Sequence, residues 1–233
     1  MNGIFSGWTV LDVTALVSVM AMWFCFAWLV ERSHWAKLSL TSVVNAQRLE
    51  WMLRLTNREA RISDASLLGN LMRSMSFFAS ATVIILGGVA AMLGSADRGY
   101  DALRSIPALS LISKELYEEK VLLLGLIFIY SFLQFTWGMR QFNYCCILVG
   151  AAPLTSDTQQ EKMAFAKMAA RVTELGARSF NHGLRGYYFA LATLAWFIHP
   201  LAYIAAGAAV VLILWRREFH SKTRRAFRGQ YGA

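Results

Sequence analysis

Long apolar runs alternate along this chain with polar stretches of helical periodicity. Trp8 to Val30 is a run of 23 residues with a single charge, Asp12, near its start. At 1.5 Å per residue it is long enough to cross the roughly 30 Å hydrocarbon layer of a membrane. The pattern predicts an all-α, polytopic membrane protein of about four transmembrane helices, forming one membrane domain over residues 1–233. The predicted spans are about residues 8–30, 74–94, 121–141 and 186–215.

The last run, residues 186–215, is longer than one straight crossing requires. Pro200 divides it, directly after His199. Proline removes a backbone hydrogen bond and kinks helices. We interpret the run as one long kinked helix, with a re-entrant pair of half-helices as the alternative.

Two polar stretches, about residues 38–62 and 160–179, are predicted to be amphipathic helices at the membrane interface. In the first, long basic side chains flank an apolar stripe, from which they can reach lipid phosphates; in the second, a charged stripe lies opposite an apolar one. A helix packed on its own domain is the alternative. The candidate lipid-binding residues are Arg54, Arg58, Arg61, Lys167, Arg171 and Arg178.

The order of span, polar helix and span occurs twice. A shift of 111 residues lays Asn70 on Asn181 and the pair 78–79 on 189–190. We interpret the chain as two tandem hairpin repeats. The alternative is chance identity between apolar sequences.

The chain is basic, with a formal net charge of +9. Because the basic residues border apolar spans, anionic lipid is the expected partner rather than nucleic acid. The Lys and Arg counts are 0 in the N-terminal tail, 7, 4 and 6 in the three loops, and 6 in the C-terminal tail. With four crossings the two sides carry 13 and 10, so the positive-inside rule barely decides the orientation. We favour loops one and three in the cytoplasm of a bacterium, with the protein in its inner membrane.

The third span has one polar helix face. Gln134 and Gln141 share that face, and Arg140 and Asn143 lie beside it. A charge inside the bilayer would be a functional candidate, whereas a charge at the boundary would be an interfacial anchor. We favour the anchor because Arg140 already lies twenty residues into the run. The candidate ligand or ion path comprises Gln134, Arg140, Gln141, Asn143, Arg73 and Arg185.

Motifs for nucleotide binding, metal sites and nucleophilic catalysis are absent from the sequence. The four histidines, His34, His182, His199 and His220, are far apart in sequence. The sequence therefore predicts no enzyme, no cofactor, no metal site and no catalytic residue.

Several phrases resemble an integral membrane family of bacteria and plants, the domain of unknown function 599. They are Arg48-Leu-Glu-Trp51-Met, Ser76-Phe-Phe-Ala-Ser80, Trp137-Gly-Met-Arg-Gln-Phe-Asn143, Gly183-Leu-Arg-Gly-Tyr-Tyr-Phe189 and Arg217-Glu-Phe-His-Ser221. The resemblance implies a multi-span membrane protein and brings no activity.

Two functions fit these observations. The first is a homo-oligomeric channel or transporter, in which the arginines favour anions. The second is a non-catalytic scaffold or accessory subunit that binds anionic lipid.

Overall fold

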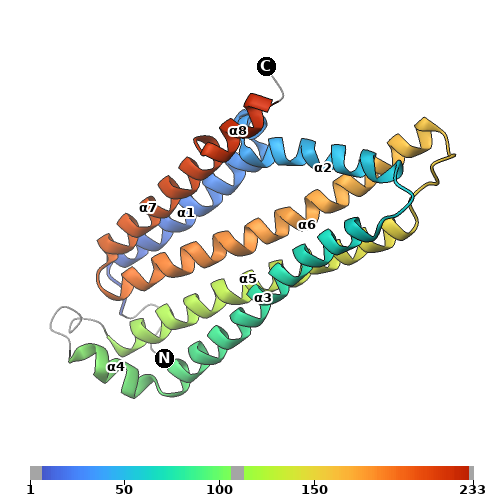
Figure 1. The fold of residues 1–233 in the computed structure, drawn as a ribbon. Coiled ribbons are helices and arrows are strands. Elements are labelled where there is room, and N and C mark those ends of the chain that lie inside the picture. The colour runs from blue at the N-terminus through green and yellow to red at the C-terminus, as the bar shows by residue number, and fades with distance from the viewer. Residues whose placement is uncertain (1–6, 106–112, 231–233) are drawn as a thin grey trace. The chain divides into compact units, whose positions relative to one another are not determined.

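The structure, a computed structural model, describes residues 7–105 and 113–230, and all regular elements in these ranges are helices. Short 3₁₀ turns, η1 (His34–Leu38) and η3 (Ala195–Phe197), lie between α-helices. The α-helices are α1 (Val10–Arg32), α2 (Leu40–Thr56), α3 (Ile62–Gly94), α4 (Ala96–Arg104), α5 (Lys114–Gly150), α6 (Gln159–Leu194), α7 (Pro200–Phe219) and α8 (Lys222–Gln230). Figure 1 shows their order along the chain.

Four helical stretches of the described chain are long and apolar enough to span a membrane, which confirms the predicted class. They are Val10–Arg32, Ile62–Gly94, Lys114–Gly150 and Pro200–Phe227. α3 and α5 exceed the predicted spans, because no helix-breaking residue separates each apolar run from its polar flank. At 1.5 Å per residue their 33 and 37 residues extend over about 50 and 55 Å.

The kinked helix predicted over residues 186–215 is wrong. α6 ends at Leu194, η3 follows, and α7 begins at Pro200 with the chain direction reversed (Figure 1). Proline suits the first turn of a helix, where its missing N–H would have no intrahelical partner. The His199 side chain supports this start, since its Nδ1 accepts a hydrogen bond from the Leu201 amide at 3.1 Å.

The predicted polar helices also differ from the structure. The first ends at Thr56, where Asn57 caps α2 by donating to the carbonyls of Arg54 and Leu55. The second is no separate helix, because α6 continues from Gln159 through residue 179 to Leu194. The two tandem parts therefore do not share one hairpin fold: a turn precedes α3, whereas the corresponding polar and apolar stretches of the second part belong to the single helix α6.

The chain forms two compact units. Unit 1 comprises residues 1–36, 82–130 and 185–217, and unit 2 comprises residues 37–81, 131–184 and 218–233. Helices α3, α5, α6 and α7 contribute residues to both. The single membrane domain predicted over residues 1–233 stays a prediction.

Unit 1 has two ends, defined by its contacts. At one end, here called the Asp12 end, the first turn of α1 meets α5 and the α6–α7 turn through Lys120 and Trp196. At the other, the Glu31 end, Glu31 contacts Arg185 of α6. The ring centroids of Trp35 and of Trp215 on α7 lie 6.2 Å apart at the same end. Within this unit α1 and α7 therefore run in one direction, and the end of α6 runs in the opposite direction.

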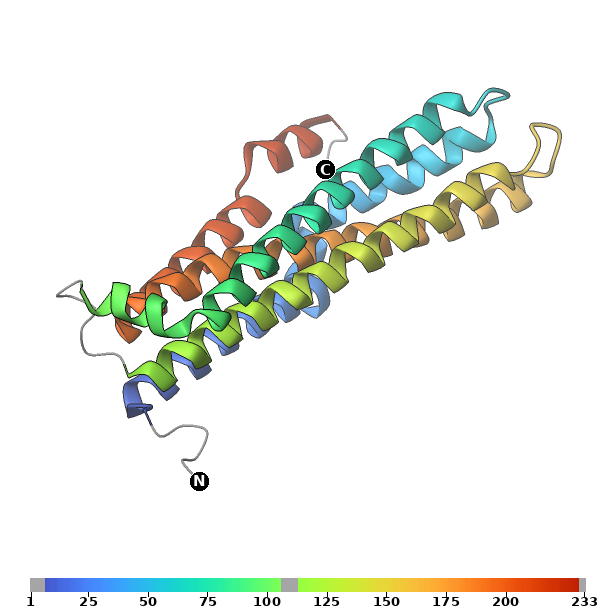
Figure 2. The same cartoon turned by 90° about the horizontal axis from the view of Figure 1, so that it is seen from below.

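In unit 2, hydrogen bonds join the α2–α3 connection to the α5–α6 connection. Arg61 donates to the carbonyls of Ala152 and Pro153, at 3.0 Å for the first. Lys162 donates to Asn57 at 3.3 Å and to the carbonyl of Thr155 at 2.6 Å. The α2–α3 and α5–α6 connections thus lie together at one end of this unit (Figure 2).

Candidate functional site

The first turn of α1 fixes a carboxylate in unit 1. Thr9 and Asp12 form a capping box, in which Asp12 Oδ2 accepts hydrogen bonds from Thr9 Oγ1 at 2.6 Å and from the Thr9 amide at 3.2 Å. A carboxylate here also interacts favourably with the helix dipole. Asp12 is nevertheless only 3% exposed. The sequence thus holds a charge in a fixed position inside a membrane-length helix.

Trp196 reaches this carboxylate from the turn between α6 and α7. Its Nε1 donates to Asp12 Oδ1 at 2.8 Å, across 184 residues of chain. The indole is buried, stacks on Tyr203 with 5.1 Å between ring centroids, and makes an edge contact with Trp8 at 5.4 Å. These rings form an apolar cover over the carboxylate.

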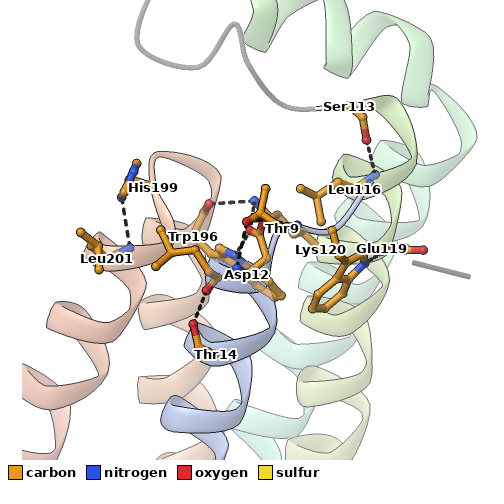
Figure 3. Close-up of polar contacts among 12 residues, drawn as sticks. Thr9, Asp12, Thr14, Ser113, Leu116, Glu119, Lys120, Trp196, His199 and Leu201 are labelled. Atoms are coloured by element: carbon orange, nitrogen blue, oxygen red, sulfur yellow. Dashed lines mark hydrogen bonds and ion pairs between the residues drawn. The ribbon is translucent and has the colours of Figure 1, made fainter. Parts of the chain in front are cut away.

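Lys120 supplies the opposite charge from α5. Its side chain is 2% exposed, and Nζ lies 3.7 Å from Asp12 Oδ1. Nζ donates to the Trp196 carbonyl at 3.0 Å and lies 5.0 Å from the centre of the Trp196 ring. Figure 3 shows Asp12, Lys120 and Trp196 converging from three parts of the chain. We call these three residues the buried charge site.

Outside this cluster, further polar contacts mark the Asp12 end. Trp8 Nε1 donates to Glu119, one residue before Lys120. Lys114, in the first turn of α5, pairs with the exposed Asp97 of α4. Along α5, the partly exposed polar residues of the first two turns therefore directly precede the buried Lys120.

When both are ionised, Asp12 and Lys120 carry two opposite charges that sum to zero. An isolated charge costs about 2.5–3.5 kcal/mol at the centre of a membrane helix on insertion scales, and less in a first turn such as that of Asp12. An opposite charge a few ångströms away offsets much of this cost. A proton that binds Asp12 would leave Lys120 as an uncompensated cation. Protonation of Asp12 would therefore change the net charge of the site from zero to +1.

The structure brings together only part of the predicted ion path. Gln134, Arg140 and Asn143 line one hollow of about 880 Å³ in unit 2, with Met72, Leu133, Thr136, Trp137, Met139 and Tyr144. Gln141 does not line it and is buried. Arg73 is exposed on α3, and its Nη2 donates to Asn70 at 2.7 Å. Arg185 belongs to unit 1, where it pairs with Glu31.

Most predicted lipid-binding residues have partners within the protein. Arg58 pairs with the buried Asp64 at 2.6 Å, and Arg61 binds two backbone carbonyls. The others are exposed or partly exposed: Arg54 pairs with Glu50 at 2.8 Å, Arg171 and Arg178 pair with Glu174 at 2.7 and 3.5 Å, and Lys167 is exposed. Their role toward lipid stays a prediction.

The sequence interpretation missed Lys120 and Trp196. Lys120 stands directly before an apolar run, so the sequence pattern places it among the loop charges. The sequence offered one clue: Asp12 is the lone acid within a span. A buried carboxylate of this kind favours a basic partner at the end of another span. Among the described residues, no group of three His, Cys, Asp or Glu side chains is placed to hold a metal ion.

Comparison with known proteins gives one match. A family model described as "Protein of unknown function, DUF599" matches residues 14–223. No curated protein and no solved structure matches the chain.

Proposed function

The chain belongs to the DUF599 family, and we propose that it is a multi-pass membrane transport protein whose buried charge site couples proton binding to anion movement. The observation that carries this proposal is the pairing of Asp12 with Lys120, both almost fully buried in membrane-length helices. No catalytic step is part of the proposal.

Stability alone is a weak reason for such a pair. Replacing a buried ion pair by apolar residues of similar volume is often neutral or stabilising. Ionisable residues within membrane helices commonly mark ion pathways and proton relays. Lys120 Nζ and Asp12 Oδ1, 3.7 Å apart, form an ion pair without a direct hydrogen bond, so the pair lacks the geometry of a tightly bonded structural salt bridge.

The pair suggests how a proton and an anion could move together. Protonation of Asp12 removes its negative charge, and Lys120 is left as a cation in an apolar surrounding. An anion that binds there restores neutrality, and loss of the proton to the other side then favours release of the anion. This extends the predicted preference for anions but assigns it to Lys120.

The reversal at Pro200 supports an odd number of membrane passes. Residues 186–198 carry no charge and run between the two ends of unit 1, as a fifth pass beside the four long helices. These 13 residues rise only about 20 Å along the helix axis. The preceding helical turn of α6 must therefore also lie in the membrane. It contains Arg185, whose charge Glu31 neutralises. Loop one then shares a side with loop three and the C-terminal tail, which places 19 of the 23 Lys and Arg residues together. By the positive-inside rule this side is cytoplasmic, and the membrane proposed is a bacterial inner membrane.

Reconstituted liposomes test this function. An imposed gradient of chloride, nitrate or inorganic phosphate should drive proton uptake, measured with an internal pH dye. Asp12→Asn should abolish proton uptake, and Lys120→Gln should abolish movement of the anion as well. Lys114→Gln is the matched control, since it removes an exposed lysine from the same helix. Wild-type protein that moves neither protons nor any of these anions would refute the proposal.

The predicted homo-oligomer is part of the proposal but a separate question. The five proposed membrane passes of one chain enclose little space, so we expect a transport path between subunits. Light scattering of the purified protein in detergent measures the number of copies. A monomer that transports would remove the oligomer from the proposal and leave the charge site in place.

The second candidate is the non-catalytic scaffold that binds anionic lipid. The observation in its favour is that Arg73, Arg140 and Arg216 each stand at one end of an uncharged run. Failure of all flux measurements, with lipid binding retained, would favour this function.

A further inference from the structure

A hollow on unit 2 lies beside the middle of α5, and no residue of the buried charge site lines it. It holds about 880 Å³ and is lined by Met72 of α3 and by one face of α5. Its α5 residues are Leu133, Gln134, Thr136, Trp137, Met139, Arg140, Asn143 and Tyr144. We infer that this hollow binds the phosphate head group of an anionic phospholipid through Arg140.

Helix geometry sets the depth of Arg140. It stands 20 residues after Lys120 on the same helix, and the residues between them carry no charge. At 1.5 Å per residue this distance is about 30 Å, the thickness of the hydrocarbon layer. With Lys120 at one boundary, Arg140 lies at the other, where phosphates are found. This boundary faces the side that carries most of the basic residues, and that side is rich in anionic lipid when it is cytoplasmic.

The guanidinium of Arg140 is oriented for such a ligand. Its Nε donates to the Tyr144 hydroxyl at 2.7 Å, and its carbon lies 5.7 Å from the centre of the Tyr144 ring. Tyr144 is the only described residue that accepts a hydrogen bond from Arg140. The guanidinium fork has five N–H donors, so others can bind phosphate oxygens. None of the nine described lining residues carries a carboxylate that would compete.

The remaining lining residues suit the rest of a lipid. The Tyr144 hydroxyl and the Asn143 amide are polar groups of the same face, on the far side of Arg140 from Lys120. In the opposite direction along α5, Leu133 and Trp137 are 58% and 53% exposed and offer an apolar surface to acyl chains. Charge complementarity and this gradient from apolar to polar together favour a lipid over a free anion.

Binding to the purified full-length protein tests the site. Thermal midpoints in detergent are measured with added phosphatidylglycerol and, separately, with phosphatidylcholine. We expect phosphatidylglycerol to raise the midpoint and phosphatidylcholine to have little effect. Arg140→Gln should weaken the apparent affinity for phosphatidylglycerol about five- to tenfold, the loss of one charge-assisted contact near a membrane surface. Arg140→Lys should recover only part of it, because it lacks the planar fork.

Controls separate a lipid site from a free-anion site and from a contact between copies of the chain. Arg225→Gln removes an exposed arginine of the same unit that is not among the predicted lipid-binding residues, and it should leave the affinity unchanged. A large excess of inorganic phosphate should not compete; equal competition would identify a free-anion site and overturn the lipid. A change of subunit number in Arg140→Gln, with no response of the wild type to phosphatidylglycerol, would instead show that a second copy covers the hollow.

The inference rests on the proposed membrane placement and not on transport. Loss of flux in Asp12→Asn or its absence in the wild type does not alter the expected lipid response. A wild-type protein that responds equally to both lipids would refute the lipid site while leaving the transport proposal intact.

Discussion

Arg185 on α6 and Glu31 at the end of α1 form an ion pair, with 2.7 Å between Nη1 and Oε1, although 154 residues separate them. Their side chains are 8% and 18% exposed. The Arg185 guanidinium also lies 5.6 Å from the centre of the Phe26 ring. Arg185 therefore joins two helices of unit 1, and its charge is neutralised rather than presented to a path.

Breaking this pair should destabilise the protein. We expect Glu31→Gln or Arg185→Met alone to cost about 3–5 kcal/mol at most, because each leaves one charge without its partner in a largely buried position. The double variant, with both residues replaced, should recover much of the loss. Unfolding by denaturant, followed by circular dichroism in detergent, measures the three free energies. Strictly additive losses would show that the two residues do not interact.

Topology should follow the reversal at Pro200. Reporter fusions after Gly94 and after His199 are expected on the outer side, and fusions after Thr158 and after Phe219 on the cytoplasmic side. The five-pass arrangement requires this alternation, since α6 and α7 run in opposite directions. A fusion after Phe219 on the same side as the one after Gly94 would restore the four-pass model.

Gly183 should be intolerant of any side chain. A Cβ there would lie 2.5 Å from Phe135 Cε1, and Phe135 is fully buried in contact with Phe78 and Phe180. Overpacking of this kind typically costs about 1–3 kcal/mol, so Gly183→Ala should lower the thermal midpoint. Gly88→Ala is the matched control, because no atom lies within 4 Å of its added Cβ. Equal midpoints for the two variants would contradict the packing at Gly183.

The stability of the first turn of α6 should depend on pH. The Thr158 side chain and amide donate to Glu161 at 2.7 and 3.0 Å and lower the pKa of this carboxyl. Because the pKa is lower in the folded state, the stabilisation is present above the unfolded value of about 4.3 and is lost as the pH falls through the folded value. Thr158→Ala should reduce this acid-dependent loss, while Thr158→Ser should retain it. Amide hydrogen exchange of the first α6 turn, measured as a function of pH, follows the effect; identical profiles for all three proteins would contradict it.

Local sequence patterns predict the class of the fold and the main apolar helices. Runs such as residues 8–30 specify a membrane-length helix almost wherever they occur, so the pattern predicts α1 to within two residues at each end. Pro200 has two structural meanings, a kink within a helix or the first residue of a new one. The residues that decide between them, Trp196 and Tyr203, stack only after the chain has turned.

The candidate site is less predictable because its partners are distant in sequence. The sequence identifies Asp12 as an acid within a span, but Lys120 and Trp196 come from other helices. Likewise, Arg58 and Arg61 are expected at the lipid surface because each is basic and lies beside an apolar stripe. In the structure, Arg58 pairs with Asp64 and Arg61 donates to the carbonyls near residue 152, and sequence periodicity carries no information about such partners.

The contact between Asp12 and Trp196 also imposes an order on biogenesis. The ribosome synthesises Asp12 184 residues before the indole that covers it. In the proposed membrane placement, the nascent chain carries this carboxylate to the bilayer long before the α6–α7 turn exists. A chain arrested before residue 196 would leave this charge without its indole cover, a feature that membrane proteases could use to recognise incomplete copies.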